Sequence, residues 1–189
     1  MKTVPAEVTT WYLEQTSPGD LVPARPAPVQ IVRAEVPSPE FARYLYTAVG
    51  GPHNWTDRLV WSHDHWQEHL TRPGVEIWTA WDRGTPAGYV ELLPPEDGAV
   101  EIICFGLVPS FIGRGIGGHL LSEGTARAWD LAARWPGLPA TTRVWLHTCS
   151  LDGPAAVPNY TRRGFRVYAT RTRVEDVWER PLGPWPGAR

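Results

Sequence analysis

The stretch Arg114–Leu121 reads RGIGGHLL and follows the run FGLVPSFIG. Four glycines fall within six residues, immediately before an apolar pattern with helical spacing. They are Gly113, Gly115, Gly117 and Gly118. The start of a helix has four unpaired backbone N–H groups and a partial positive charge, and glycines leave those groups uncovered. The stretch therefore predicts a strand, a glycine-rich turn and a helix that together bind a phosphate group, the alternative being a turn that only reverses the chain.

The glycine spacing also matches the G-x-G-x-x-G fingerprint of dinucleotide-binding domains. That fingerprint requires a parallel βαβ unit and an acidic residue at the end of the next strand. Here three strand-like runs joined by hairpin turns come first, and the next strand ends in His147 and Thr148. The context therefore disfavours a dinucleotide site.

The elements around the glycines predict an α+β fold. The runs 75–82, 85–94 and 99–109 are separated by DRGTP and PPEDG, which have the composition of hairpin turns. Helical spacing continues over 115–135. The other expected elements are strands at 30–36 and 141–150, helices at 38–51, 62–74 and 152–164 with Ser38 and Ser62 as N-caps of the first two, and a strand or hairpin at 166–179. Together they predict a mixed, mostly antiparallel central sheet flanked by helices.

The length of 189 residues predicts one main domain. Residues 1–28 are expected to form an N-terminal extension, made of the short strand TWYLEQ and a proline-rich linker. Residues 29–189 are expected to form a single domain.

Composition and charge narrow the functional class. The formal net charge is −2 and no basic run stands out, which argues against a protein that binds nucleic acid through its phosphates. No apolar run approaches 18 residues, so neither a signal peptide nor a membrane span is expected. Cys104 and Cys149 form no CxxC pair and no disulfide framework. A buried thiol at Cys104 and a cytoplasmic location are the expectations.

Two segments carry a family resemblance. The run EIICFGLVPSFIGRGIGGHLL resembles the acetyl-CoA-binding motif of the GNAT superfamily of N-acetyltransferases, in which a strand leads through Gln/Arg-x-x-Gly-x-Gly/Ala into a long helix. Ile112 stands at the Gln/Arg position, which is a departure from that pattern. The run AAVPNYTRRGF resembles the family's A-x-x-x-Y-x-x-x-G-F segment. Two motifs in the right order are more specific than either alone, and the resemblance covers roughly residues 30–173.

The resemblance implies that an amine attacks the thioester of acetyl-CoA directly. It implies that the strand CFGLV diverges from its neighbour and binds the pantetheine arm through its backbone, while the amides of Arg114 to His119 hold the pyrophosphate. Asp152 is expected as the cap of the following helix, and this position is also a candidate contact to CoA. The cofactor-binding candidates are Phe105, Gly106, Leu107, Val108, Gly113, Arg114, Gly115, Ile116, Gly117, Gly118, His119, Asp152 and Tyr160.

Tyr160 is the expected general acid for the departing thiolate, because a phenol has a pKa of about 10, near that of a thiol. Its alternative is a core tyrosine at a helix end. Glu101 is the first candidate base, since the histone-acetyltransferase branch of the family has its catalytic glutamate at this spacing. Glu91 is the second, and a water chain is the third. His147 and Cys149 are expected beside the cleft.

The segment after the first expected helix is the candidate acceptor site. Trp55, Arg58 and Trp61, with Trp66, predict an aromatic wall with one cation, suited to an acceptor with an aromatic ring or a carboxylate. The alternative is that these tryptophans anchor two short helices to the sheet. His65-x-x-Glu68-His69 matches a zinc-protease pattern, but no third ligand is evident, so we expect a solvated helix face and no metal.

The sequence therefore predicts an acetyl-CoA-dependent N-acetyltransferase that acts on a primary amine of a small molecule. Acylation of a protein or peptide amine is the alternative substrate class, and a CoA-binding module without activity is the alternative function. The expected partner is the small-molecule amine, with no nucleic acid and no membrane. The resemblance also allows a homodimer paired through the C-terminal strands.

Overall fold

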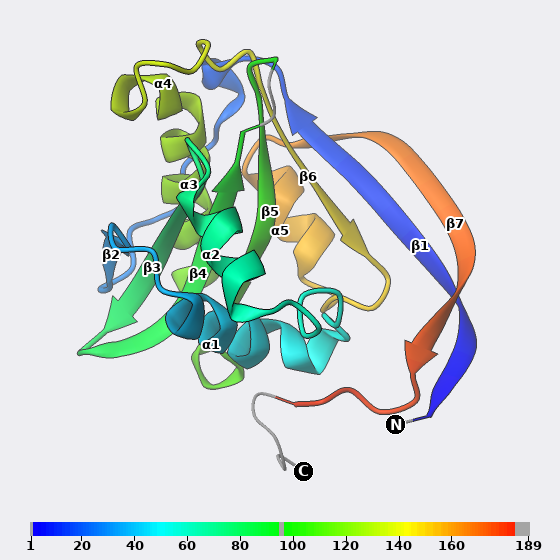
Figure 1. The fold of residues 1–189 in the computed structure, drawn as a ribbon. Helices are drawn as coiled ribbons and strands as arrows, with labels where there is room; N and C mark the ends of the chain where they lie inside the picture. The colour runs from blue at the N-terminus through cyan, green and yellow to red at the C-terminus, as the bar shows by residue number, and fades with distance from the viewer. Residues whose placement is uncertain (1, 95–96, 184–189) are drawn as a thin grey trace.

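The computed structural model describes residues 2–94 and 97–183 (Figure 1). The strands are β1 (Thr3–Gln15), β2 (Gln30–Arg33), β3 (Glu76–Asp82), β4 (Thr85–Leu93), β5 (Ala99–Leu107), β6 (Arg143–Cys149) and β7 (Arg166–Trp178). The helices are α1 (Pro39–Gly50), α2 (His63–Thr71), α3 (Ile116–Trp129), α4 (Leu131–Arg134) and α5 (Ala156–Arg162). Short 3₁₀ turns are η1 (Pro18–Asp20), η2 (Gly51–His53) and η3 (Pro109–Phe111).

The strands form one seven-stranded sheet in the order β2-β3-β4-β5-β6-β1-β7. Every neighbouring pair is antiparallel except β5 and β6, which are parallel. The predicted α+β fold with a mixed, mostly antiparallel sheet is confirmed. The C-terminal run forms the single strand β7 rather than a hairpin.

The first strand differs from the prediction. β1 has 13 residues instead of the six of TWYLEQ, and it lies between β6 and β7 in the sheet. Thr10 to Gln15 pair with β6, and Thr3 to Glu14 pair with β7 (Figure 1). The N-terminal segment is therefore part of the same sheet as the expected domain. Local patterning missed this because the backbone partners of β1 lie more than a hundred residues away in the chain.

Local signals fixed several element boundaries. Ser38 and Ser62 cap α1 and α2 as predicted, each accepting a hydrogen bond of 3.2 Å from a backbone N–H. The β3–β4 turn has Arg83 and Gly84 in the left-handed region, the conformation of a two-residue hairpin turn. The turn PPEDG includes residues 95 and 96, which lie outside the described residues. The expected helix 115–135 is divided into α3 and α4 at Asp130.

The sheet has a hydrophobic core on each face. Figure 1 shows α1 and α2 in front of β3 to β5, with α3 and α5 behind the sheet. Leu120, Leu121 and Tyr160 pack behind with Val90 and other buried residues of the strands. Leu45 and Trp66 pack in front with residues that include Ile77 and Tyr89. Each face of the central strands is therefore covered by helices, which leaves the ends of the strands as places for a site.

In the described part of the chain, none of the helices combines the length and apolar character needed to cross a bilayer.

Candidate active site

The sheet opens between β5 and β6. These parallel strands pair only from Ala99 to Glu101 on β5, opposite Arg143 to Trp145 on β6. Beyond Glu101 the two strands diverge (Figure 1), so the rest of β5 has a strand partner on the β4 side alone. We call this divergence the fork. It is the splay that the resemblance implied for the strand CFGLV.

The backbone of β5 presents free groups to the fork. The N–H of Val108 donates to the carbonyl of Ala87, at 2.9 Å, so Val108 is directed towards β4. Residues in an antiparallel ladder alternate in direction, so Gly106 is also directed towards β4, whereas Phe105 and Leu107 are directed into the fork. Of the four residues predicted to contact pantetheine, Phe105 and Leu107 therefore direct their N–H and C=O groups into the fork.

A bulge lies just past the start of the fork. Glu91 pairs with Cys104, but the next residue of β4, Leu92, pairs with Ile102, so Ile103 is an extra residue on β5. As a result, Ile102 packs in the core behind the sheet while Cys104 packs in front. Cys104 is buried as predicted, and burial raises the pKa of its thiol to about 12.

The glycine-rich turn leads directly into α3. Gly113 and Gly115 have φ angles of +85° and +77°, a conformation that L side chains rarely adopt. A Cβ on Gly117 would make only ordinary contacts, the nearest with Leu107 at 3.5 Å. A Cβ on Gly118 would lie 3.2 Å from that of Ala24, so this glycine has a packing reason. Gly113 and Gly115 serve backbone geometry, and Gly117 places no side chain over the first turn of α3.

An open hollow of about 380 Å³ adjoins this turn. Its lining comes from the β3–β4 hairpin and from Phe111 and Arg114 at the turn. Arg114 is exposed and lies 3.2 Å from Asp82, and its guanidinium stacks on the Phe111 ring at 4.9 Å. Ile116 is buried in the core, while His119 is half-buried. Of the predicted phosphate-binding residues, Arg114 therefore offers its side chain to solvent at the mouth of the site.

Tyr160 lies on α5 on the same face as the glycine-rich turn. Its ring packs edge-to-face on Phe105 of β5, with the ring centroids 5.8 Å apart. Burial raises the pKa of Tyr160 well above its usual value, so the phenol holds its proton. Among the described residues, no group forms a hydrogen bond with its hydroxyl. The hydroxyl is thus a protonated donor beside the fork.

The opposite face of the fork carries Glu101 and His147. A carboxylate oxygen of Glu101 lies 3.2 Å from Nδ1 of His147, across the point where β5 and β6 part. The side chain of His147 is 47% exposed and that of Glu101 is 12% exposed. Tyr12 of β1 and Trp145 of β6 lie beside the imidazole, with centroids 5.9 and 6.3 Å away. The two candidates that the sequence kept apart therefore form one pair.

Glu91, the second candidate base, lies in a closed ionic cluster. Its side chain is 1% exposed, and both of its carboxylate oxygens accept from Arg58 at 2.9 Å. His69 Nε2 lies 2.6 Å from one of the same oxygens. Burial opposes ionisation, but the contacts with His69 and Arg58 outweigh it and lower the pKa of Glu91. A carboxylate so occupied is a poor proton acceptor, and Arg58 has no free charge to offer a substrate carboxylate.

The predicted aromatic wall exists, but it surrounds Arg58 rather than an open cleft. The Arg58 guanidinium lies 4.9 Å from the Trp61 ring centroid and 5.7 Å from that of Trp66. Trp66 is buried, and Trp61 packs on it with centroids 5.0 Å apart. Trp66 lies within α2 and Trp61 just before it, so these two tryptophans anchor α2 and the preceding segment to the sheet, much as the alternative interpretation expected for two short helices.

Trp55 spans the open end of the fork. Its ring fits against Gly50, where a Cβ would come within 2.2 Å of it, at the end of α1. Its indole N–H donates to Asp152 at 3.4 Å, in the loop after β6. Asp152 also accepts from Thr148 at 2.5 Å and from the backbone of Cys149 at 3.1 Å. The prediction that Asp152 caps the next helix is wrong, because α5 begins at Ala156 and Asp152 instead fixes this loop.

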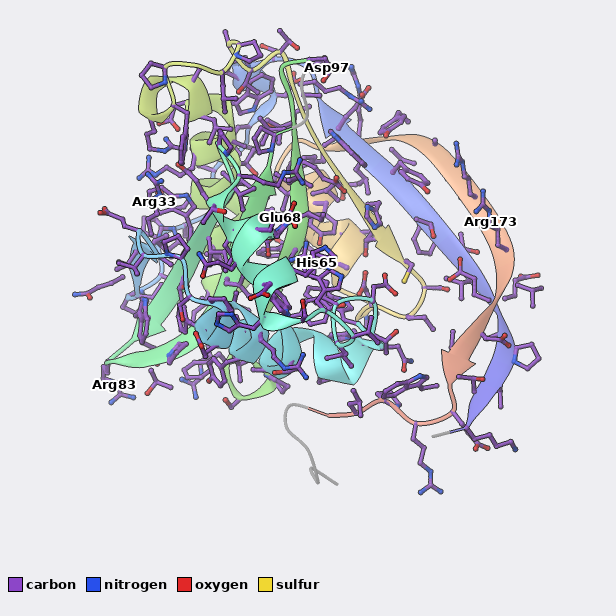
Figure 2. All side chains as sticks on the ribbon, in the orientation of Figure 1. Arg33, His65, Glu68, Arg83, Asp97 and Arg173 are labelled. Carbon is purple, nitrogen blue, oxygen red and sulfur yellow. The ribbon has the colours of Figure 1, made fainter. Side chains whose placement is uncertain are left out.

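The residues of the zinc-protease pattern on α2 lie in different environments, some in solvent and one in the core. His65 and Glu68 project from α2 into solvent (Figure 2), whereas His69 is buried against Glu91. The expectation of a fully solvated helix face is therefore wrong for His69. Within residues 2–94 and 97–183, no three His, Cys, Asp or Glu side chains gather into a group that could hold a metal ion.

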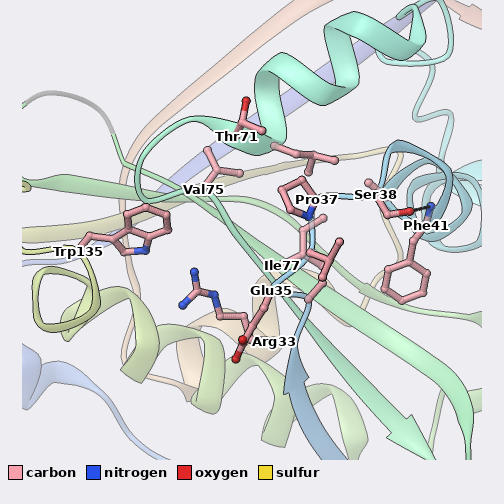
Figure 3. A pocket seen from close by; sticks show the side chains of 13 residues that line it. Arg33, Glu35, Pro37, Ser38, Phe41, Thr71, Val75, Ile77 and Trp135 are labelled. Carbon is pink, nitrogen blue, oxygen red and sulfur yellow. Dashed lines mark hydrogen bonds between the residues drawn. The ribbon is translucent and has the colours of Figure 1, made fainter.

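A separate cavity of about 190 Å³ lies between the β2–α1 connection and the end of α2 (Figure 3). Val75 and Ile77 of the β3 region contribute apolar surface, and Arg33 and Trp135 also line the cavity. Arg33 pairs with Glu76 at 3.3 Å and stacks on Trp135 at 5.4 Å. In the strand order, β4 separates β3 from the fork, so this cavity is not part of the candidate active site.

The fork, the glycine-rich turn and α5 together match a known family. The model of the acetyltransferase (GNAT) family matches residues 40–165. The chain belongs to this family. The match begins in α1 and ends just after α5, so it contains the fork and both motifs but not β1 or β7.

Individual family members agree with this assignment. An uncharacterized N-acetyltransferase of Mycobacterium bovis, Mb2688, is 33% identical over 105 residues, which are 56% of this chain and 62% of the relative. The chain thus spans less than two thirds of that relative's length. A GCN5-related N-acetyltransferase from Kribbella flavida has a TM-score of 0.62 at 20% identity, covering 93% of this chain and 60% of that one. Another, from Sphaerobacter thermophilus, has a TM-score of 0.62 at 17% identity, covering 95% and 54%. At such identities the two structures show a shared fold.

Proposed function

We propose that this chain transfers an acetyl group from acetyl-CoA to the primary amine of a small molecule. The observation that carries the proposal is a fork with different chemistry on its two faces. The glycine-rich turn and Tyr160 lie on the α3 and α5 face, while Glu101 and His147 lie on the α1 and α2 face. Donor and acceptor can therefore meet from opposite sides of the sheet.

The residues on the donor side fit acetyl-CoA. The uncovered amides at the start of α3 suit the pyrophosphate, because backbone N–H groups and the helix dipole favour an anion there. The backbone groups of Phe105 and Leu107 suit the amides of pantetheine, as an added strand would pair with them. Bound there, acetyl-CoA supplies an activated acyl carbon that an amine can attack without a covalent enzyme intermediate.

The acceptor must lose a proton before it attacks, and the departing thiolate must gain one. Tyr160 is the donor for the thiolate, because its buried phenol is protonated and its ring packs against Phe105 of the fork. Glu101 supplies a carboxylate on the α1 and α2 face, where we expect the acceptor amine to bind. Glu91 is set aside as the base, since Arg58 and His69 occupy its oxygens.

The side chains that bridge the open end of the fork favour a small acceptor. Val49 of α1 lies over Gly106, where a Cβ would come within 2.5 Å of it. From the same region, Trp55 reaches across to Asp152 beyond the end of β6. A groove bridged in this way suits a molecule that enters from one side better than a polypeptide that passes through. Acylation of a flexible peptide end is the alternative, and a panel that includes an N-terminal peptide amine distinguishes the two.

Calorimetry with acetyl-CoA tests the donor half of the proposal, with NADH as the control ligand. We expect binding of acetyl-CoA alone. Gly117→Glu places a carboxylate where the phosphate is expected, and loss of charge-assisted hydrogen bonds should weaken binding roughly 10- to 100-fold. Gly137→Glu is the matched control, because a Cβ at Gly137 meets nothing within 4 Å and Gly137 lies outside the glycine-rich turn. An absence of acetyl-CoA binding by the unmodified protein would refute the proposal.

Turnover then separates an enzyme from a CoA-binding module. Thiol release from acetyl-CoA is followed with a set of primary amines. Binding of acetyl-CoA without thiol release for any amine, including a peptide amine, would favour the module.

A further inference from the structure

We propose that His147 is the group that accepts the proton from the acceptor amine, and that Glu101 is a positioning residue that orients its imidazole. This inference rests on the proposed function and deepens it, because it reassigns the base from the carboxylate to the ring beside it. It is carried by the geometry of the pair and by its place in the fork.

The contact with Glu101 determines which ring nitrogen is free. Nδ1 of His147 lies 3.2 Å from the Glu101 carboxylate, and a carboxylate accepts but does not donate when ionised. In the neutral imidazole the proton therefore resides on Nδ1, and the lone pair is on Nε2. In the part of the chain that the structure describes, no group forms a hydrogen bond with Nε2. The ring thus offers an unoccupied acceptor, held as a histidine is held by aspartate in serine proteases.

The positions along the strands favour His147 over Glu101 as the group that meets the amine. Glu101 is the last residue of β5 that pairs with β6, so its carboxylate lies at the closed start of the fork. His147 is two residues beyond Trp145, the partner of Glu101, which places it about 7 Å further into the fork. Its side chain is also about four times more exposed than that of Glu101. An amine entering the fork therefore reaches the imidazole first.

Neighbouring aromatic rings restrict the imidazole. The Tyr12 ring is inclined by 35° to it at 5.9 Å, and the Trp145 ring by 31° at 6.3 Å. Tyr12 is opposite His147 in the pairing of β1 and β6. A base held from three sides keeps its lone pair in one direction, which lowers the entropy lost in proton transfer. β1, which lies outside the family match, thus contributes to the site.

Charged groups on the surrounding elements favour the protonated ring. Glu101 of β5 is the nearest, and Asp152 after β6 and Asp57 before α2 add smaller attractions. Arg171 of β7 lies over the Tyr12 ring, 5.4 Å from its centroid, and is not among the groups that shift the pKa of His147. The contact with Glu101 raises the pKa of His147 above its usual value, although burial acts against it. The same carboxylates attract an ammonium group to the fork.

The proton balance is complete with these residues. The acceptor ammonium gives one proton to Nε2 of His147, and the resulting amine attacks the thioester carbon. The carbon–sulfur bond then breaks, and the thiolate takes the phenolic proton of Tyr160. The nitrogen of the new amide still carries one extra proton, which it gives to the phenolate of Tyr160. His147 then releases its proton to solvent. The net reaction forms one amide and one thiol and releases one proton.

The pH dependence of acetyl transfer is the first test, with tyramine and 1,5-diaminopentane as probe amines. The base must be deprotonated, so kcat/KM should rise with pH up to the raised pKa of His147. His147→Gln should lower kcat about 10²- to 10⁴-fold and remove that rise. Glu101→Gln should move the rise to lower pH, because the contact that raises the pKa is lost. His63→Gln is the matched control, since His63 is exposed and lies on α2.

Two further readouts separate this inference from a structural role and from the proposed function. Imidazole added to His147→Gly should restore part of the rate, which it would not do if the ring only filled space. Nitrogen-15 NMR of the unmodified protein should place the neutral-ring proton of His147 on Nδ1, whichever amines are substrates. Acetyl transfer by His147→Gln with an unchanged pH profile, or a neutral ring protonated on Nε2, would overturn the inference. Failure of the unmodified protein to bind acetyl-CoA would instead refute the proposed function.

Discussion

Replacement of the Glu91 carboxylate should lower the free energy of unfolding far more than the same replacement at an exposed glutamate. Glu91→Gln keeps the size of the side chain but removes its charge, leaving the Arg58 guanidinium buried without a counter-ion. The side chain of Arg58 is 7% exposed and that of Glu91 is 1% exposed, so water cannot replace the lost partner. Breaking a buried ion pair of this kind costs about 3–5 kcal/mol of unfolding free energy. The expected loss is a large part of a typical total stability of about 5–15 kcal/mol.

Urea denaturation and calorimetry measure this loss. For a chain of this size, each kcal/mol shifts the melting temperature by about 2–4 °C, so Glu91→Gln should melt roughly 6–20 °C lower. Glu68→Gln is the control, because Glu68 is an exposed glutamate (Figure 2) on α2, the helix whose His69 contacts Glu91. The double variant Arg58→Met/Glu91→Leu removes both charges and should lose less than the two single changes added together. A Glu91→Gln protein within about 1 kcal/mol of the unmodified one would refute the reasoning.

The pH dependence has a defined sign. The folded-state pKa of Glu91 is lowered, so its contribution is complete above the unfolded glutamate pKa of about 4.3. It is lost as the pH falls through the lower folded-state pKa. The stability difference between the unmodified protein and Glu91→Gln should therefore stay constant from about pH 8 to pH 5 and shrink in stronger acid. A difference that changes most near neutral pH would refute the assignment of this pH dependence to Glu91.

Two further changes test the donor side of the fork. Tyr160→Phe should lower kcat about 10²- to 10⁴-fold while the Kd for acetyl-CoA and the melting temperature stay nearly constant. Steady-state kinetics measure kcat, and calorimetry measures the Kd and the melting temperature. An unchanged kcat would exclude the Tyr160 hydroxyl as the general acid. Ile112→Arg should tighten acetyl-CoA binding about two- to five-fold, because Ile112 is 59% exposed beside the glycine-rich turn and the new charge would lie near the proposed phosphate site. Val60→Arg adds the same charge at a site that is 88% exposed but away from the turn, and equal tightening there would show a general effect of net charge.

Short-range sequence signals predicted the parts of the fold that short-range forces control. Ser38 and Ser62 begin their helices because a hydroxyl three residues before an N–H can satisfy it without tertiary help. Gly113 and Gly115 mark a turn because their left-handed conformation excludes other residues. The motif around these glycines also led to the family and to the opening of β5 away from β6.

Interactions between distant segments were not predictable in the same way. Arg58 and His69 lie 33 and 22 residues from Glu91, and nothing in the local pattern of any of the three indicates that they meet. The sequence analysis therefore assigned Arg58 to substrate binding and Glu91 to catalysis. In the folded protein the two side chains instead form a buried ion pair with each other. The loop contacts of Asp152 depend likewise on Trp55, 97 residues away.

The sequence by itself determined the order of strands and helices, the helix caps and the glycine-rich turn, because each depends on groups within a few residues of one another. Only the tertiary structure decided that β1 lies inside the sheet, that Glu91 is enclosed by Arg58 and His69, and that Glu101 faces His147. The role of a charged side chain depends on the partner that the packed sheet and helices bring within a few ångströms of it. Once such a pair is buried, separating it leaves an unpaired charge in the core, which costs several kcal/mol.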